Sequence, residues 1–320
     1  MGGWIGKFES ASEREDLSAY IASLPFKDTI KFAGELSCLL KRESPWLQGV
    51  SLPCKKFMPI ISPNPLHARF KVETVMIGDD CTSGVHLIVR EAYTRLKEAV
   101  LKRDDRKGIY LHGAVGIGKS SLLYTLVTYL RIEQSSGVES RIRVTYVNDC
   151  AAWANSPYDY LLNELVATFA NDSLRIEKLA ENVLIESQQY ARETKLRRII
   201  NIVFAYVRTK NIKWFVIIDQ LNALFKTSNP LYGVFPFSLI ELLATSKLAN
   251  ILVSASANNA AFPAEFQNWE KHDLDVLPVK YDEKEFELWS ERIVPPPSED
   301  ETRQIKYWTG AIPLELDIAH

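Results

Sequence analysis

The residues best suited to chemistry in this sequence form one glycine-rich stretch, residues 113–121, which reads Gly-Ala-Val-Gly-Ile-Gly-Lys-Ser-Ser. It follows an apolar run at 109–111 and opens a segment with helical spacing of apolar residues. The glycines let the backbone turn tightly, so that successive N–H groups can point at phosphate oxygens. A lysine and a hydroxyl at a helix start add a cation for the β- and γ-phosphates and a ligand for Mg²⁺. The pattern predicts a phosphate-binding loop of the Walker A type, with a nucleoside triphosphate as its ligand.

Nine consecutive residues are expected to hold the phosphates through backbone N–H groups and side chains. They are Gly113, Ala114, Val115, Gly116, Ile117, Gly118, Lys119, Ser120 and Ser121. Of these, we expect the Lys119 ammonium to reach the β- and γ-phosphates and the Ser120 hydroxyl to bind Mg²⁺.

A second motif, the Walker B type, is an apolar run that ends in an acid, Trp-Phe-Val-Ile-Ile-Asp at residues 214–219. A strand that is buried on both faces of a parallel sheet reads this way. We therefore expect Asp219 to hold Mg²⁺ together with Ser120, directly or through water. The alternative is that its carboxylate only caps the end of the strand.

Gln220 stands where many hydrolysing relatives of such proteins have a glutamate. A glutamine can orient the attacking water but cannot take its proton. Either hydrolysis is slow or helped by another acid, or the protein is a nucleotide-gated switch. Asp149 is the candidate for that acid, because it ends the strand expected beside the strand of Asp219; the alternative is that it caps the next helix. The catalytic candidates are therefore Lys119, Asp219, Gln220 and Asp149.

Further residues at predicted strand and helix ends are weaker candidates. Ser256 and Asn258 could sense the γ-phosphate or make only structural hydrogen bonds, and Gly310 and Pro313 could touch adenine or form a simple turn. An arginine finger could come from several places: Arg192, Arg197, Arg292 or Arg303. The helix face around Arg197 and Arg198 is either a solvated face or a site for DNA, a partner or a neighbour's phosphates. No guanine-reading Asn-Lys-x-Asp motif occurs, which favours ATP over GTP.

The order of elements predicts an α/β fold. Strands at 109–111, 141–149, 214–219, 250–256 and 273–279 alternate with helices at 121–132, 158–169, 174–209 and 239–248. This alternation predicts a parallel sheet covered on both faces, with the ligand at the carboxyl ends of the strands. Two short helices, at 282–292 and 298–308, are expected to follow.

The chain before the glycine-rich loop is harder to interpret. We expect helices at 13–24 and 26–41, irregular chain at 51–80 where four prolines occur, and a helix at 84–103. The expected organisation is an N-terminal segment at 1–83, a nucleotide-binding core at 84–280 and a helical lid at 281–320.

Composition excludes several classes of protein. The 320 residues are 47% hydrophobic and 24% charged, with a net charge of −2, so no overall basic field favours nucleic acid. The four cysteines are far apart, which argues against a zinc site or a disulfide framework and favours a reducing, intracellular compartment. No apolar run is long enough to cross a membrane.

Several segments together resemble the NTPase region of Crinkler effectors and the related retrotransposon hot spot proteins. They are Thr-Tyr-Val-Asn-Asp-Cys-Ala-Ala-Trp at 145–153, the strand and Asp-Gln-Leu-Asn-Ala-Leu-Phe at 216–225, Ser-Ala-Ser-Ala-Asn at 254–258 and Thr-Gly-Ala-Ile-Pro-Leu-Glu-Leu at 309–316. The resemblance covers roughly residues 60–320. It implies an additional-strand P-loop ATPase related to the STAND and AAA-like groups, with Lys119, Ser120 and Asp219 in the usual roles. It also implies an effector that is secreted into a host cell, acts in its nucleus and has a host protein or DNA as partner.

The sequence thus predicts a Mg²⁺-dependent ATPase, acting on acid anhydrides, with ATP and Mg²⁺ as cofactors and slow turnover. One alternative is a nucleotide-gated scaffold that self-associates or captures a partner with little hydrolysis. Weaker alternatives are a nucleic-acid-associated NTPase and a small-molecule kinase, for which no substrate pocket can be identified in the sequence.

Overall fold

The structure is a computed structural model. It describes residues 49–53, 62, 64, 73–77, 80–88, 91–102, 108–135, 140–170, 172–174, 176, 179–180, 183, 188–226, 230–256, 274–279, 283–290 and 297–309. The helices expected at 13–24 and 26–41 lie outside these residues. In the part of the chain that is described, no helix is both long and apolar enough to cross a bilayer.

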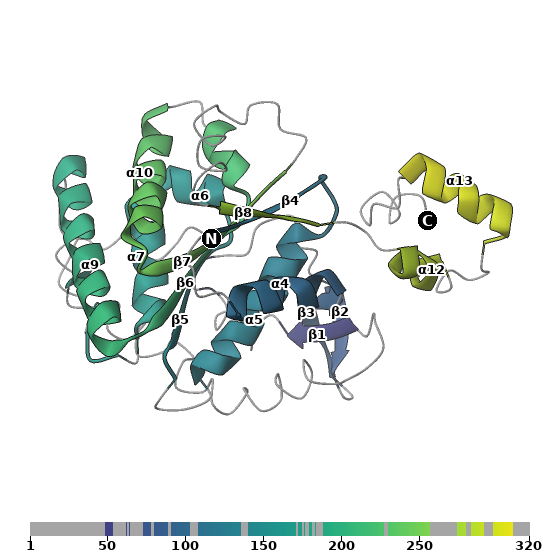
Figure 1. Cartoon of the computed structure of the whole chain (residues 1–320), viewed down its shortest axis with the longest axis horizontal. Helices are drawn as coiled ribbons and strands as arrows, with labels where there is room; N and C mark the ends of the chain where they lie inside the picture. The colour runs from purple at the N-terminus through teal and green to yellow at the C-terminus, as the bar shows by residue number, and fades with distance from the viewer. Residues whose placement is uncertain are drawn as a thin grey trace.

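A five-stranded parallel sheet forms the centre of the molecule (Figure 1). Its strands are β4 (Gly108–Gly113), β5 (Ile142–Val147), β6 (Lys213–Ile218), β7 (Ala249–Ser256) and β8 (Leu274–Pro278). They lie in the order β5-β6-β7-β4-β8, and every pairing is parallel. β7 separates β4 from β6, so the strand before the glycine-rich loop and the strand before Asp219 have one strand between them. The predicted α/β fold, of the additional-strand P-loop type, is confirmed.

Helices cover both faces of the sheet, which explains why its strands are apolar on both sides. One face carries α7 (Pro157–Thr168), α9 (Gln189–Lys210) and α10 (Pro230–Ser246), and the other carries α4 (Glu91–Leu101) and α5 (Lys119–Ser135) (Figure 1). Side chains of β6 alternate between the two cores. Trp214, Val216 and Ile218 pack in the core on the α7 side, and Phe215 and Ile217 pack in the core on the α5 side.

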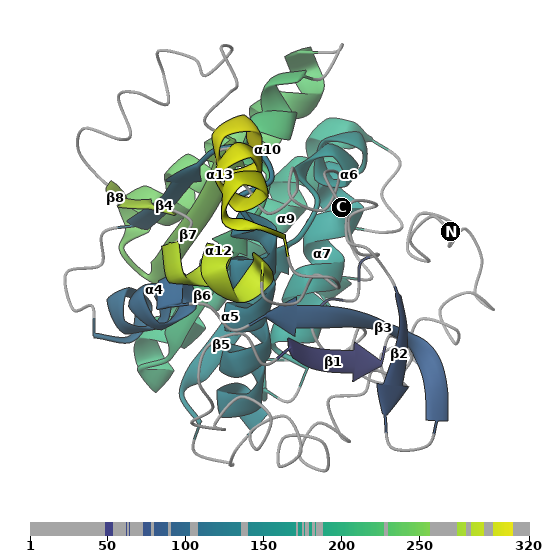
Figure 2. The same ribbon diagram turned by 90° about the vertical axis from the view of Figure 1, so that its right-hand side faces the viewer.

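The chain before the core forms a second, antiparallel sheet. It contains β1 (Gly49–Pro53), β2 (Glu73–Ile77) and β3 (Asp80–Ile88), in the order β1-β3-β2 (Figure 2). The prediction of irregular chain at 51–80 was therefore wrong at β1 and β2. The prediction of a helix from residue 84 was also wrong, since β3 continues to Ile88 and α4 begins at Glu91. Antiparallel pairing with β1 gives residues 84–88 a backbone partner that helical spacing alone could not reveal.

Two short helices follow the sheet, as predicted. α12 (Glu283–Ser290) and α13 (Glu299–Thr309) stand beside each other, away from the parallel sheet (Figure 1). Lys306 of α13 forms an ion pair with Glu283 of α12. A capping box starts α13, because the Ser298 N–H donates to Glu301 Oε2 at 2.8 Å and the Glu301 N–H donates to Ser298 Oγ at 3.4 Å.

Candidate functional site

The loop between β4 and α5 has a backbone shape that suits a bound phosphate. Gly116 and Gly118 have φ angles of 81° and 85°, in the left-handed region that strains an L side chain. A Cβ atom added to Gly113 would lie 3.0 Å from Ile117 Cγ2 and 3.0 Å from the Val279 carbonyl oxygen. The first turn of a helix has N–H groups with no partner inside the helix, and its positive end favours an anion. The loop therefore fits a phosphate group.

The nine predicted phosphate-binding residues run from the last residue of β4, Gly113, through this loop to the first turn of α5. Val115 is exposed at the loop, with 41% of its surface accessible, while Ile117 is buried beneath it. Ala114 and Ser120 are half-buried, and Ser121 is exposed. Ser120 occupies the second position of α5, directly after Lys119.

Lys119 bends back over the loop. Its Nζ donates to the carbonyl oxygens of Gly113 at 2.7 Å and Ala114 at 2.6 Å. Burial lowers the pKa of Lys119 from 10.5 to about 8, and the Asp219 carboxylate opposes this shift. A buried ammonium whose charge is disfavoured gains from the arrival of an anion, because the anion restores the preference for the charged form.

Asp219 lies at the carboxyl end of β6 and is almost fully buried. Its Oδ1 accepts hydrogen bonds from the Ser254 hydroxyl and, at 2.9 Å, from the Gln220 N–H. Its own N–H donates to the Val147 carbonyl oxygen at 2.8 Å, which ties it to the end of β5. Two hydrogen bonds thus hold the carboxylate and a third holds the backbone of Asp219, at the same end of the sheet as the glycine-rich loop.

Gln220 has a strained backbone. Its φ is 60°, an angle that costs a non-glycine residue about 1–3 kcal/mol and is retained where the surroundings enforce it. Two hydrogen bonds hold this conformation, because the Gln220 N–H donates both to Asp219 Oδ1 and, at 3.2 Å, to Ser254 Oγ. The backbone of Gln220, a half-buried residue, is therefore fixed directly after the acid that is expected to bind Mg²⁺.

Asp149 follows β5, and β5 pairs in parallel with β6, as the sequence predicts. Its Oδ1 accepts from the N–H groups of Ala151 at 2.9 Å and Ala152 at 3.0 Å, so it caps α6 (Cys150–Asn155). The capping alternative is thus confirmed, whereas the role as a catalytic acid stays a prediction. The adjacent Cys150 is fully buried, and burial raises the pKa of its thiol, with the carboxylates of Asp219 and Asp149 adding to the rise.

The remaining candidates have different outcomes. Ser256 ends β7 and is the backbone partner of Gly113, which places it at the start of the loop. Asn258, Gly310, Pro313 and Arg292 lie outside the described residues.

The face of α9 around Arg197 is not simply a solvated basic face. Arg192 pairs with Asp159 of α7, and Arg197 pairs with Glu193 at 2.9 Å and donates to Ser238 Oγ of α10 at 2.7 Å. These two arginines therefore help α9 pack on its neighbours. Arg198 is exposed, and Arg303 pairs with Asp300 on the exposed surface of α13.

Sequence reasoning missed two groups of polar residues. Ser254 is a buried hydroxyl that directly follows the apolar run at 251–253 of β7, and that polar interruption was its only signal. The second group surrounds Glu164, which lies on α7, a helix buried at every residue except Asp159; its Oε2 lies 3.9 Å from Nη2 of Arg131 on α5. Burial raises the pKa of Glu164 to about 7, while Arg131 and hydrogen bonds from Ser62 and Asn64 oppose the rise.

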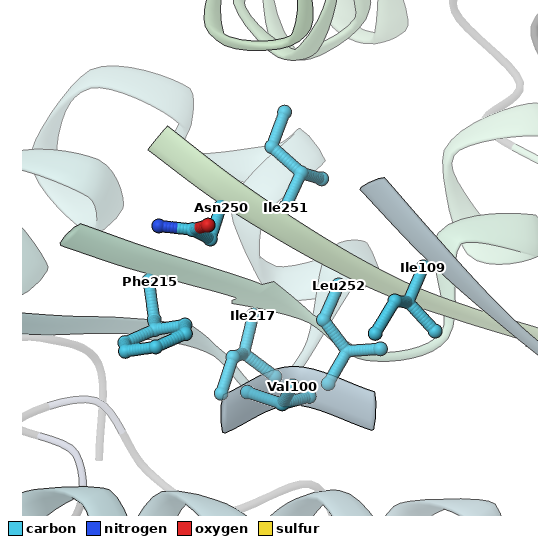
Figure 3. A pocket seen from close by; sticks show the side chains of 7 residues that line it. All are labelled: Val100, Ile109, Phe215, Ile217, Asn250, Ile251 and Leu252. Carbon is cyan, nitrogen blue, oxygen red and sulfur yellow. The ribbon is translucent and has the colours of Figure 1, made fainter. Parts of the chain in front are cut away.

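A pocket lies near the amino ends of the strands, opposite the glycine-rich loop. Its lining residues are Val100, Ile109, Phe215, Ile217, Asn250, Ile251 and Leu252. Figure 3 shows Ile109, Ile217 and Leu252 pointing toward Val100 of α4. The one polar side chain among them, Asn250, donates to the Trp214 carbonyl oxygen at 3.1 Å. This uncharged lining does not suit a phosphate, so the candidate site is the loop at the other end.

The described residues contain no cluster of three or more His, Cys, Asp or Glu side chains that could hold a metal ion. A site made of one hydroxyl and one carboxylate, Ser120 and Asp219, fits instead the sparse protein coordination that Mg²⁺ has beside phosphates.

Neither a family model nor a curated protein matches this chain. Among solved structures it is similar to the ORC2 protein of Aeropyrum pernix in ADPNP–ADP complexes, with 16% identity and a TM-score of 0.40 over 78% of this chain and 59% of that one. It is similar to the Walker-type ATPase PABY2304 of Pyrococcus abyssi, with 16% identity and a TM-score of 0.40 over 79% and 68% of the two chains. It is also similar to Cdc6p of Pyrobaculum aerophilum, with 12% identity and a TM-score of 0.35 over 78% and 55%.

Proposed function

We propose that this protein is a Mg²⁺-dependent ATPase with slow turnover. The observation that carries the proposal is the meeting of Lys119 and Asp219 at one end of the sheet, around a loop whose glycines have left-handed backbone angles. A cation, a loop of amide donors and a buried carboxylate together match the needs of a phosphate chain with its metal ion. The lack of a guanine-reading motif supports ATP as the nucleotide.

Each residue has a role in this proposal. The backbone N–H groups of residues 114–120 bind the phosphate oxygens, and Lys119 exchanges its two carbonyl partners for the β- and γ-phosphates. Ser120 and Asp219 would hold Mg²⁺, which when bound supplies positive charge to neutralise the phosphates. Ser254 holds the Asp219 carboxylate in place through its hydroxyl.

Slow turnover follows from Gln220. Its side chain can orient a water molecule but cannot remove the proton from it. Asp149 lies on the neighbouring strand end and would have to accept that proton, while one of its oxygens already caps α6. An acid that is shared between capping and proton transfer supports modest rates rather than efficient ones.

Phosphate release from ATP with Mg²⁺ tests this function, measured beside binding of a fluorescent ATP analogue (mant-ATP). We expect Lys119→Ala to abolish nucleotide binding and Asp219→Ala to abolish turnover, while a control, Lys102→Ala, leaves both unchanged. Lys102 suits as a control because it pairs with Glu98 on the exposed surface of α4. Nucleotide binding that survives in Lys119→Ala would contradict the assignment of the loop.

A nucleotide-gated switch is the second candidate function. It is favoured by the glutamine after Asp219 and by the capping role of Asp149, because neither residue is committed to proton transfer. In this case ATP drives self-association or capture of a partner. Light scattering with and without ATP·Mg²⁺ distinguishes the two functions, since a switch changes mass with nucleotide while releasing negligible phosphate.

We also propose that the chain is related to the NTPase modules of Crinkler effectors, with residues 281–320 as a lid. The support is the set of sequence segments around Asp149, Asp219 and Ser254. If so, it acts inside a host cell, with a host protein or DNA as its partner. Nuclear localisation of a tagged chain expressed in host cells tests this, and strict exclusion from the nucleus would count against it.

A further inference from the structure

Two polar residues from the stretch before the core are buried in it. Ser62 and Asn64 lie within a segment of the sequence that contains four prolines and that the sequence predicts to be irregular. In the structure both side chains are buried, with 5% and 6% of their surface accessible. Burial of polar groups costs free energy unless hydrogen bonds are made, so the partners of these two residues show what holds them there.

One set of partners anchors the pair to α7. Ser62 Oγ donates to Glu164 Oε1 at 2.5 Å, and Asn64 Nδ2 donates to the same oxygen at 2.9 Å. Asn64 Nδ2 also lies 3.2 Å from the Tyr160 carbonyl oxygen, and Asn163 Nδ2 donates to Asn64 Oδ1 at 3.4 Å. The Glu164 carboxylate, the Tyr160 carbonyl and the Asn163 amide of α7 thus fix both residues against one helix.

A second set of partners leads toward the candidate site through Asn148, which is fully buried at the end of β5. Asn148 Nδ2 donates to Ser62 Oγ at 3.1 Å and to the Asn64 carbonyl oxygen at 3.4 Å. Asn148 Oδ1 accepts from the Tyr160 hydroxyl at 2.7 Å, and that hydroxyl accepts from the Asp149 N–H at 3.2 Å. A continuous chain of hydrogen bonds therefore runs from Ser62 to the backbone of Asp149.

This chain of hydrogen bonds ends beside the residues that are proposed to act on the nucleotide. Asp149 caps α6, and two residues before it the Val147 carbonyl accepts the Asp219 N–H at 2.8 Å. β5 is an edge strand of the sheet, so in the described structure β6 is its only partner in that sheet. The carboxyl end of β5 is also held by hydrogen bonds within the cluster of Ser62, Asn64, Asn148 and Tyr160, in which Asn148 directly follows the strand.

We propose that Ser62 and Asn64 are positioning residues of the nucleotide site, which hold the end of β5 beside Asp219 through Asn148 and Tyr160. This inference rests on the proposed function. The hydrogen bonds of the cluster join β5, α6 and α7, whereas the phosphates are proposed to bind the loop between β4 and α5. Loss of the cluster should therefore impair Mg²⁺-dependent steps more than affinity for the nucleotide itself.

Three single variants test the proposal: Ser62→Ala, Tyr160→Phe and, as a matched control, Tyr206→Phe. The Tyr206 hydroxyl donates to Asp172 Oδ1 at 2.9 Å, and Asp172 pairs with Arg143 near the start of β5, away from the site. We expect the first two variants to lower Mg²⁺-dependent ATP turnover by about 3- to 10-fold, with mant-ATP affinity measured without Mg²⁺ within about twofold of wild type. The control should match wild type in both.

The double variant Ser62→Ala/Tyr160→Phe distinguishes coupling from general weakening. Residues that act through one hydrogen-bonded chain are not additive, so the double variant should lose little more than the worse single variant. If the wild type binds but does not hydrolyse ATP, the strengthening of mant-ATP binding by Mg²⁺ serves as the readout. If Ser62→Ala does not fold, Tyr160→Phe, which removes only a hydroxyl, carries the comparison with the control.

The outcomes separate the two proposals. Wild-type protein that binds no mant-ATP overturns the proposed function and this inference with it. Wild-type protein that binds the nucleotide, together with Ser62→Ala and Tyr160→Phe variants that equal it or equal the Tyr206→Phe control, overturns the positioning role alone.

Discussion

Glu164 should make the stability of the protein fall as the pH rises through neutrality. Its carboxyl is fully buried, and burial raises its pKa from 4.5 to about 7, although the Arg131 guanidinium and hydrogen bonds partly oppose the rise. Between these two values the native state keeps a proton that the unfolded state has lost. The native state then binds more protons, so the free energy of unfolding decreases with increasing pH. The contribution is fully present below about pH 4.5 and is lost as the pH passes about 7.

The magnitude follows from the two pKa values. One pH unit corresponds to about 1.4 kcal/mol, so a rise from 4.5 to about 7 is worth about 3 kcal/mol. That amount is a large fraction of the roughly 5–15 kcal/mol that stabilises a typical domain. It should therefore be visible above the titration of other groups, which is common to wild type and variant.

The variant Glu164→Gln removes this titration and keeps a side chain of similar shape. Urea unfolding, followed by the fluorescence of the buried Trp153 and Trp214, would be measured from pH 5 to pH 8. We expect the stability difference between wild type and variant to shift by about 2–3 kcal/mol over this range, against the wild type at high pH. Glu193→Gln is the control, because Glu193 pairs with Arg197 at a partly exposed position. Wild-type and Glu164→Gln curves that stay parallel within about 0.5 kcal/mol would refute the reasoning.

Three other predictions concern the candidate site directly. Asp149→Asn keeps an oxygen for the helix cap and removes the acid, so it should abolish most turnover with little loss of stability. Asp149→Ala should also lower the free energy of unfolding in urea by about 1 kcal/mol, because the cap is lost. Unchanged turnover in Asp149→Asn would exclude Asp149 as the catalytic acid. ATP affinity, measured by titration calorimetry, should weaken as the pH rises above about 8, because Lys119 then loses the charge that attracts phosphate; a flat profile up to pH 9.5 would contradict this. Gly113→Ala should lower the free energy of unfolding by about 1–3 kcal/mol, since its Cβ would meet Ile117 and the Val279 carbonyl at 3.0 Å; a variant as stable as wild type would show that the loop can relax.

The parts of the fold that the sequence predicts well are those determined by local pattern. The loop at 113–121 needs glycines at fixed positions, and the apolar run of β6 needs helices on both faces. Both features can therefore be predicted from the sequence without knowing which residues they contact. β2 and β3 also had a local signal, because the sequence pair Gly78-Asp79, which suits a two-residue hairpin turn, directly follows the apolar run Val-Met-Ile at 75–77. The four prolines at 51–80 favour a prediction of irregular chain over one of strands.

The rest depended on contacts between distant residues. Ser62 and Glu164 meet across 102 positions of the sequence, and no spacing rule connects a serine before the core with a glutamate on α7. In the sequence Arg192 and Arg197 indicate a basic face on α9, whereas in the structure Arg192 contacts Asp159 and Arg197 contacts Ser238. The capping of α6 by Asp149 was an equal alternative, because its sequence position fits a cap and a catalytic acid alike.

Because Cys150 is buried, the reactivity of its thiol reports local opening of the structure at the end of β5. A thiol with no access to solvent and a raised pKa is a poor nucleophile, so an alkylating reagent should modify it only while the surrounding structure is open. The rate of its labelling then measures how often α6 separates from the strand ends. Read peptide by peptide with and without ATP, that rate would give the free energy with which a nucleotide closes this edge of the sheet.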